Sequence, residues 1–338
     1  MTFIQDAEQV TRGFSLATPL HVGGPDISKK INGLALRHNA SAPRSTIPPR
    51  EIVSNQAYSD LVTYITEEDS AFWCFMDPQA RPSFTHQLLV DLADMQSMIK
   101  QLFAGGAEPF NYFILASRSQ GVFNLGGDLT LFADKIREGD REGLRHYAYS
   151  CVETGHTNYR GYDNGVVTIA LMQGDALGGG LECALSCDVL IAERHAKFGL
   201  PEVLFNLFPG MGAYSYLARR VGMLKAEEMI LGGRTYTAEE MLALGAIDMV
   251  VEPGEGEHAV RSYIARNHTR QQALSTVYKA RRRVNPVSLD ELRDVTDLWV
   301  DAAMRLSEQD LRRMSRIAAA QDRFRRRSAE MAAVQSHM

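Results

Sequence analysis

Two glutamates, Glu182 and Glu202, stand 20 residues apart in settings that would disturb a carboxylate. Glu182 ends the segment 177–182 (LGGGLE), and Glu202 lies in 199–203 (GLPEV), so apolar residues flank both. Apolar surroundings raise the pKa of a carboxyl group, which can then exchange protons near neutral pH. A neighbouring glycine turn can expose backbone N–H donors to a substrate oxygen. Together these features predict an acid/base site with an oxyanion hole.

Each motif also has a purely structural explanation. Glu202 follows a proline, a position where a carboxylate stabilises the start of a helix through its dipole. Asp128 ends a glycine-containing segment, 119–128 (SQGVFNLGGD), and is suited to capping a helix. The segment 177–182 lacks the later glycine of a dinucleotide fingerprint and the lysine of a phosphate-binding loop, so phosphate binding is disfavoured. The order of the three motifs along the chain is what favours a chemical site.

Composition narrows the function classes. A chain of 338 residues with 45% hydrophobic content can bury a large core, and a net charge of −5 gives no field suited to nucleic acid or an anionic membrane. The longest apolar stretch, 166–192, contains Asp175, Glu182 and Asp188, which argues against a membrane span. Four cysteines without CxxC or zinc spacing, and no signal-peptide pattern, predict reduced thiols, no metal and a cytoplasmic protein.

Periodicity predicts an α/β fold with a mostly parallel sheet, because strand patterns alternate with helix patterns. A helix is expected after Pro82, capped by Ser83 or Thr85. Strands are expected at 71–76, 110–116, 166–171, 189–192 and 248–251. Helices are expected at 128–162 (broken near 139–140), 178–187, 212–231 and 238–244. The domains predicted are a loosely ordered extension at 1–48, an α/β core at 49–255 and a helical region at 256–338.

An apolar stripe marks the helical region. Its spacing of three and four residues is typical of a helix face that packs on the core or on another subunit. Trp299 is also a candidate pocket wall. The stripe consists of Leu292, Val295, Trp299, Ala302 and Leu306.

The combined motifs resemble the crotonase (enoyl-CoA hydratase/isomerase) superfamily over roughly residues 110–255. In that family one oxyanion N–H precedes the aspartate of the first loop, here Gly127, and the other belongs to the middle glycine of the GGG turn, here Gly179. Hydratases carry glutamates at the positions of Glu182 and Glu202. The resemblance implies a spiral of ββα units with a helical C-terminal layer, no cofactor, and trimers that often pair into hexamers.

Longer strings resemble a narrower group, the bacterial synthases of diffusible signal factor, which make cis-2-unsaturated fatty acid signals for quorum sensing. The strings are 123–129 (FNLGGDL), 199–205 (GLPEVLF) and 207–215 (LFPGMGAYS), and the resemblance continues around 299–301. It fails over the N-terminal extension. General hydratases usually have alanine where Gly127 stands, which favours the synthase group.

This resemblance implies a 3-hydroxyacyl thioester on acyl carrier protein as the substrate. Its carbonyl oxygen would lie between the N–H groups of Gly127 and Gly179, with Glu202 removing the C2 proton and Glu182 protonating the departing hydroxyl. The same hole would then serve thioester hydrolysis and release the free cis-2-enoic acid. The enzyme would thus be a lyase with thioesterase activity.

Substrate and partner contacts are less marked in the sequence. Gly178 lies in the turn against the substrate, and Leu177, Met211 and Trp299 are candidates for an apolar acyl slot, with ordinary core as the alternative. An acidic carrier protein would suit the basic clusters 281–283 and 323–327, although charge runs usually face water.

Two other functions stay open at this point. The first is an ordinary enoyl-CoA hydratase or isomerase that acts on CoA thioesters. The second is a crotonase-fold regulatory binding protein without turnover, which the presence of both Glu182 and Glu202 disfavours. A regulatory sensor protein is a further possible partner.

Overall fold

The computed structural model of the protein describes residues 48–54, 56–104 and 109–320. Contacts divide the chain into two units between Ala42 and Pro43. Only the second unit contains described residues. The extension predicted for 1–48 therefore lies outside them, apart from Pro48, and so do 321–338 with the basic cluster 323–327.

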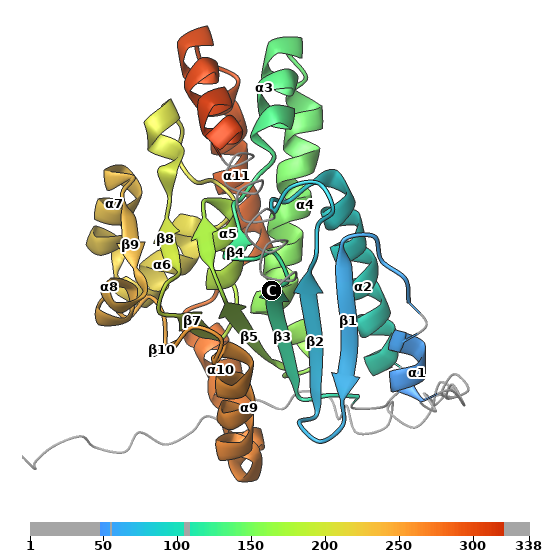
Figure 1. Cartoon of the computed structure of the whole chain (residues 1–338). Helices are drawn as coiled ribbons and strands as arrows, with labels where there is room; N and C mark the ends of the chain where they lie inside the picture. Colours follow the sequence, from blue (N-terminus) through green and yellow to red (C-terminus); the bar gives the residue numbers. More distant parts are fainter. Residues whose placement is uncertain (1–47, 55, 105–108, 321–338) are drawn as a thin grey trace, which may run out of the picture. The chain divides into compact units, whose positions relative to one another are not determined.

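A six-stranded sheet runs through this unit in the order β1-β2-β3-β5-β7-β10 (Figure 1). All neighbouring strands are parallel except β1, which pairs antiparallel with β2 at the edge. The strands span Leu61–Thr66 (β1), Ala71–Met76 (β2), Tyr112–Ser117 (β3), Val167–Met172 (β5), Val189–Glu193 (β7) and Met249–Val251 (β10).

The parallel strands are buried on both faces, as their unbroken apolar sequences require. Successive side chains of a strand point to opposite faces. On β2, Trp73 joins a core that includes Val260 of the helix Gly256–Asn267 (α9), whereas Phe72 and Cys74 join the larger core on the other face.

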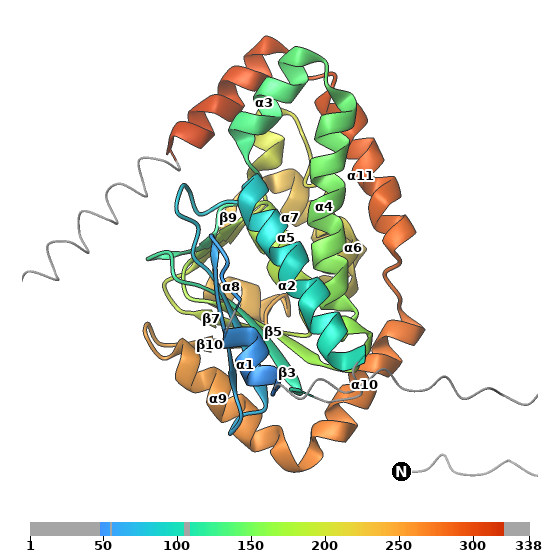
Figure 2. The same cartoon turned by 90° about the vertical axis from the view of Figure 1, so that its right-hand side faces the viewer.

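Helices cover both faces of the sheet. Figure 2 shows α2 (His86–Ala104), α4 (Arg141–Tyr159) and α11 (Leu289–Ala303) as neighbours on the side of the larger core. The helix α9 packs on the smaller core of the opposite face. The other helices are α1 (Pro49–Ser54), α3 (Leu129–Glu138), α5 (Gly179–Leu185), α6 (Ala213–Val221), α7 (Met223–Gly232), α8 (Ala238–Ala243) and α10 (Gln271–Val284), with 3-10 turns at Gly161–Asp163 (η1), Pro201–Phe205 (η2) and His268–Arg270 (η3); residues 308–320 are also helical.

A second, four-stranded sheet positions the chemical motifs. Its order is β4-β6-β8-β9, and β4, β6 and β8 are parallel neighbours. Because parallel strands end at the same edge, the segments that follow them meet there. Those segments are the Gly126-Gly127 loop, the glycine turn from Gly178 and the Pro201-Glu202 turn. The strands are Val122–Asn124 (β4), Asp175–Leu177 (β6), Lys197–Gly199 (β8) and Thr235–Thr237 (β9).

The predicted α/β fold with a helical C-terminal region is confirmed. Thr85, not Ser83, caps α2, since its hydroxyl accepts a hydrogen bond from the Leu88 N–H. The break near residue 139 is also confirmed: Gly139 ends α3 in a left-handed conformation and Asp140 caps α4. The helix predicted over 212–231 is in fact two helices that meet at Gly222.

The apolar stripe of the C-terminal region faces the core. Leu292 and Trp299 on α11 are buried, and α11 packs along α4. Leu298 lies off the stripe and is exposed. Across the described residues, no helix has the combined length and apolar character that spanning a membrane would require. Residues 43–338 cluster as one unit by their contacts. The domain boundary predicted at residue 255 therefore stays a prediction.

Candidate active site

The glycine turn after β6 presents a free amide at the start of α5. Gly178 caps this helix with a φ of +51°, a conformation that L side chains rarely adopt. The first intrahelical bond runs from the Glu182 N–H to the Gly178 carbonyl, so the N–H of Gly179 precedes the bonded part of the helix. Among the described residues, no backbone or side-chain acceptor pairs with the Gly179 N–H.

A second free amide lies beside the first. The loop after β4 is held by a hydrogen bond from the Phe84 N–H to the Gly126 carbonyl at 2.8 Å. A methyl group built on Gly179 would lie 3.4 Å from the Gly127 nitrogen, so the two turns touch. The Gly127 N–H likewise donates to no acceptor within the described residues. Two unpaired N–H groups at one point are the arrangement that an oxyanion hole requires.

Glu182 is held in place by backbone donors. Its side chain leaves the first turn of α5 and is buried, with 3% of the residue exposed. Its Oε1 accepts hydrogen bonds from the N–H groups of Met211 at 2.8 Å and Ala213 at 2.9 Å. Both donors belong to the segment that leads into α6. One carboxyl oxygen is thereby fixed, and no hydrogen bond within the described residues holds the other.

Glu202 enters the same cavity from the turn η2. Its Oε1 lies where a side chain on Gly178 would be, 2.5 Å from a methyl group built there. Although part of Glu202 is exposed, its Oε2 is buried and has no hydrogen-bond partner among the described residues. An unpaired buried carboxyl oxygen is costly, which indicates a group kept for binding or chemistry.

Burial raises the pKa of both carboxyl groups. The pKa of Glu182 rises to about 7, because loss of solvent outweighs the two N–H donors that stabilise its charge. The pKa of Glu202 rises to about 8, through loss of solvent and then through repulsion by the Glu182 charge. Each group can therefore hold a proton near neutral pH, and the charge of one carboxylate makes ionisation of the other harder.

The structure brings most of the predicted site residues to one cavity. Besides the two glutamates, its lining includes the predicted residues Gly127, Gly178, Gly179, Met211 and Trp299. Leu177 is not part of the lining: it lies before the turn, with its side chain 3.6 Å from a methyl group built on Gly199. The apolar remainder of the lining includes Phe132 and Ile317.

Two aromatic residues at the site were missed from the sequence. Phe132 on α3 lines the cavity, and its ring packs edge-on against Trp299 with centroids 5.1 Å apart. The Tyr147 hydroxyl on α4 accepts a hydrogen bond from the Asp128 N–H at 3.1 Å and donates one to the Phe84 carbonyl. Helical periodicity predicts that such residues are buried, but it does not reveal which loop they will contact.

Asp128 has the capping role that its position predicted. Its carboxylate accepts hydrogen bonds from the N–H groups of Thr130 and Leu131 at the start of α3. It thus fixes the helix that directly follows the Gly127 amide.

Comparison with known proteins agrees with this geometry. The family model described as enoyl-CoA hydratase/isomerase matches residues 74–319, which include both glutamates and both free amides. The fatty acid oxidation complex subunit alpha of Pseudomonas savastanoi pv. phaseolicola is 34% identical over 172 residues, or 50% of this chain and 22% of that protein. The fatty acid oxidation complex subunit alpha of Pseudomonas aeruginosa PAO1 is 36% identical over 140 residues, which cover 41% of this chain and 19% of that protein. The chain thus spans about a fifth of the length of these relatives.

Solved structures share the fold. The enoyl-CoA hydratase of Bacillus halodurans superposes with a TM-score of 0.66 at 21% identity, covering 76% of this chain and 99% of that one. DspI of Pseudomonas aeruginosa superposes with a TM-score of 0.55 at 27% identity, and the match covers 67% of this chain and 89% of DspI. With a family model that matches most of its length and includes both glutamates and both free amides, the chain belongs to the enoyl-CoA hydratase/isomerase family.

Proposed function

We propose that this protein dehydrates a 3-hydroxyacyl thioester on acyl carrier protein and hydrolyses the product to a free cis-2-unsaturated fatty acid. The observation that carries the dehydration is the fixed Glu182 carboxyl beside Glu202, facing the free amides of Gly127 and Gly179. Enzymes of this family act as lyases and hydratases. The strings 123–129, 199–205 and 207–215 support the narrower substrate and product.

In the proposed dehydration, the ionised Glu202 takes the C2 proton, and the electron pair moves onto the thioester oxygen. The Gly127 and Gly179 amides stabilise that oxyanion. When the enolate collapses, the C3–O bond breaks and Glu182 gives its proton to the departing hydroxyl, which leaves as water. Dehydration therefore needs a proton on Glu182 when the substrate binds, and the raised pKa of both carboxyl groups lets the pair hold a proton near neutral pH.

In the proposed hydrolysis, water adds to the thioester carbonyl while a glutamate takes one of its protons. The tetrahedral oxyanion occupies the same hole, and its collapse breaks the C–S bond. The thiolate leaves, takes up the proton, and the free acid remains. Both reactions need one oxygen stabilised by Gly127 and Gly179, which is why a single site can serve both.

The carrier protein would need a basic docking surface. Of the predicted cluster 281–283, Arg281 and Arg282 bind the buried Asp188 at 2.5 and 2.6 Å. Their charges are thus already used within the fold. Arg281 and Arg283 are both exposed, but within the described residues Arg283 alone of the cluster forms no ion pair. Any docking by this cluster therefore rests on Arg283.

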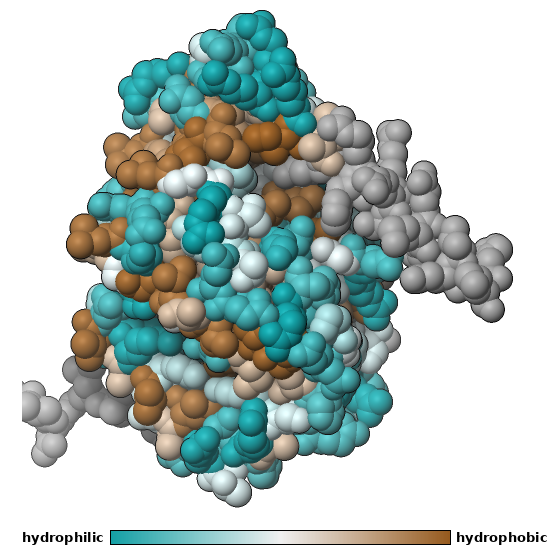
Figure 3. Space-filling model, turned by 60° about the vertical axis from the view of Figure 1, so that its left-hand side comes forward, coloured by the Kyte–Doolittle hydropathy of each residue, from teal (hydrophilic) through white to brown (hydrophobic). Residues whose placement is uncertain are grey.

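Self-association is part of the proposal. Figure 3 brings forward the side on which α7 and α8 lie in Figure 1, and apolar side chains reach the surface there. Large exposed apolar residues of this region are Leu204, Met223, Leu224, Leu231 and Leu242. Such a concentration is unusual on a monomer and suits the proposed trimer or hexamer.

An enoyl-CoA hydratase acting on CoA thioesters is the second candidate, supported by the matching family model. One assay separates the two. Matched 3-hydroxyacyl thioesters on carrier protein and on CoA are incubated with the enzyme, and the products are identified by mass spectrometry. The proposal predicts a free cis-2-enoic acid from the carrier-linked substrate. A trans-2-enoyl thioester as the sole product, formed faster from CoA, would contradict it. No turnover on either substrate would favour a regulatory binding protein.

A further inference from the structure

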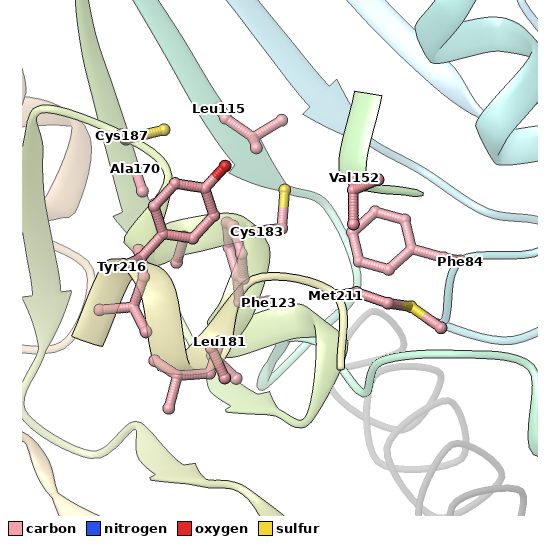
Figure 4. Close-up of a cluster of buried hydrophobic side chains, with 14 of the residues drawn as sticks. Phe84, Leu115, Phe123, Val152, Ala170, Leu181, Cys183, Cys187, Met211 and Tyr216 are labelled. Atoms are coloured by element: carbon pink, nitrogen blue, oxygen red, sulfur yellow. The ribbon is translucent and has the colours of Figure 1, made fainter. Parts of the chain in front are cut away.

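A second cavity adjoins the active site on the far side of Met211. It shares the wall formed by Gly179, Glu182 and Met211 with the cavity that holds Glu202. In Figure 4, Phe84, Val152, Cys183 and Tyr216 are all drawn above Met211, within one apolar cluster. The remaining wall of the second cavity includes Phe84, Cys151, Gly155, Cys183 and Tyr216.

The lining of this second cavity suits a hydrocarbon. Glu182, at the shared wall, is its one charged residue. The thiols of Cys151 and Cys183 are neutral there, because burial raises the pKa of Cys183 to about 12 and that of Cys151 further still. A charged or strongly polar ligand would lose its hydration on entering this cavity and would find few hydrogen-bonding groups to compensate.

Met211 forms the wall between the two cavities together with Gly179 and Glu182. Its backbone is fixed, because its N–H donates to Glu182, but its side chain is unbranched and flexible. The cavities measure about 30 Å³ at the active site and about 20 Å³ beyond Met211. By this measure roughly 10–15 Å³ holds one water, so neither accepts a chain of several carbons until they merge. Rotation of the Met211 side chain would join them without moving Glu182.

We propose that the second cavity receives the distal end of the acyl chain, and that Gly155 sets the chain length accepted. This inference rests on the proposed function, in which Glu182 protonates the hydroxyl on C3. Carbons C4 and beyond then leave C3 beside Glu182 and Met211, which is where the second cavity begins. The competing route runs past Phe132 and Trp299 in the first cavity.

Gly155 is suited to this role because it leaves space on an otherwise filled helix. A methyl group built there would lie 3.7 Å from the Tyr216 hydroxyl and 3.8 Å from Ser186 Cβ, which is ordinary contact. Alanine therefore fits, whereas a leucine would project into the cavity. Cys151, one turn earlier on α4, lines the same cavity, and its removal would enlarge it.

The test measures kcat/KM over a series of straight-chain 3-hydroxyacyl thioesters from short to long. Gly155→Leu should leave short substrates unchanged and lower the value for long ones by about fourfold for each methylene excluded. Gly155→Ala should shift the preference in the same direction but less, and Cys151→Ala should shift it toward longer chains. Thr157→Leu places the same leucine side chain on α4 outside the cavity and should leave the preference unchanged.

The outcomes are distinguishable. The quantity that decides is the ratio of kcat/KM for long substrates to kcat/KM for short ones. If Gly155→Leu leaves this ratio at the wild-type value and Trp299→Ala changes it, the inference is overturned but the proposed function stands. If Gly155→Leu fails to fold, as thermal unfolding would show, Gly155→Ala and Cys151→Ala decide by whether they shift the ratio in opposite directions. A wild-type enzyme inactive on every chain length would overturn the proposed function, and this inference with it.

Discussion

The Phe132 ring occupies the space that a side chain at position 127 would need. A methyl group built on Gly127 would lie 2.8 Å from Cε2 of that ring and closer still to Cζ. The ring packs edge-on against Trp299 on one side and Tyr147 on the other, with centroids 5.1 and 5.2 Å apart. Glycine at 127 thus permits an aromatic layer to lie directly against one of the two free amides.

The first prediction follows from that contact. Gly127→Ala should lower kcat by about a hundredfold, because the methyl group displaces either the Phe132 ring or the amide that stabilises the oxyanion. Smaller side chains at 132 should relieve the clash, so Gly127→Ala/Phe132→Leu should recover part of the loss. Gly232→Ala, at a helix position with open space, is the matched control. Steady-state kinetics on all four proteins measures the effect, and full activity in Gly127→Ala would refute it.

A second prediction concerns Tyr147, whose hydroxyl holds the loop that carries the Gly127 amide. Tyr147→Phe removes the hydroxyl that joins the Asp128 N–H to the Phe84 carbonyl. We expect kcat to fall by about tenfold, which corresponds to the free energy that one hydrogen bond contributes, with KM little changed. A rise in KM at constant kcat would instead indicate a binding role.

A third prediction links the active site to stability. The pKa of Glu202 is raised from 4.5 to about 8 in the folded protein, so the folded state keeps a proton that the unfolded chain releases. The free energy of unfolding therefore falls as pH rises from about 4.5 to about 8. Glu202→Gln has no proton to lose and should be more stable than wild type at pH 8, by on the order of a few kcal/mol. Below pH 4.5 the difference should vanish.

Urea unfolding at a series of pH values measures this difference, with the linear extrapolation made at each pH. The matched control is Glu142→Gln, since Glu142 is exposed on α4. A Glu202→Gln variant less stable than wild type at pH 8 would show that the carboxylate stabilises the fold.

A fourth prediction separates structural from exposed arginines. Arg282 is buried and binds both carboxyl oxygens of the buried Asp188. Arg282→Ala should destabilise the protein by about 3 kcal/mol, because removing one partner leaves a buried charge partly unpaired. Arg283→Ala should leave stability unchanged, as measured by chemical unfolding. If Arg283→Ala also leaves the salt dependence of turnover on the carrier-linked substrate unchanged, this cluster has no part in docking.

Local motifs could be predicted from the sequence more reliably than the residues that contact them in the folded structure. The Glu182 and Glu202 motifs and the glycine turn could be predicted because each is written in a few consecutive residues. The unbroken apolar runs likewise located β2, β3, β5 and β7. The strands β4, β6, β8 and β9 have three residues each, which leaves little periodicity to detect, although the equally short β10 was predicted at 248–251 from its apolar run.

Contacts between distant elements could not be predicted. Leu177 is close to Glu182 in sequence but does not line the cavity that holds both glutamates, whereas Phe132 and Ile317 do. The second cavity combines residues of α4, α5 and α6 with Phe84, and no local pattern connects them. Such a cavity arises from how helices pack, which depends on all the side chains between them.

The central claim is that Glu182, Glu202 and the Gly127 and Gly179 amides act on one substrate as a single acid/base site. Its most direct test is exchange of the C2 proton of a saturated acyl thioester with deuterium from the solvent, followed by mass spectrometry. Wild type should catalyse this exchange, and Glu202→Gln should slow it by at least about a hundredfold. Exchange at the wild-type rate in Glu202→Gln, with the variant folded, would contradict the account.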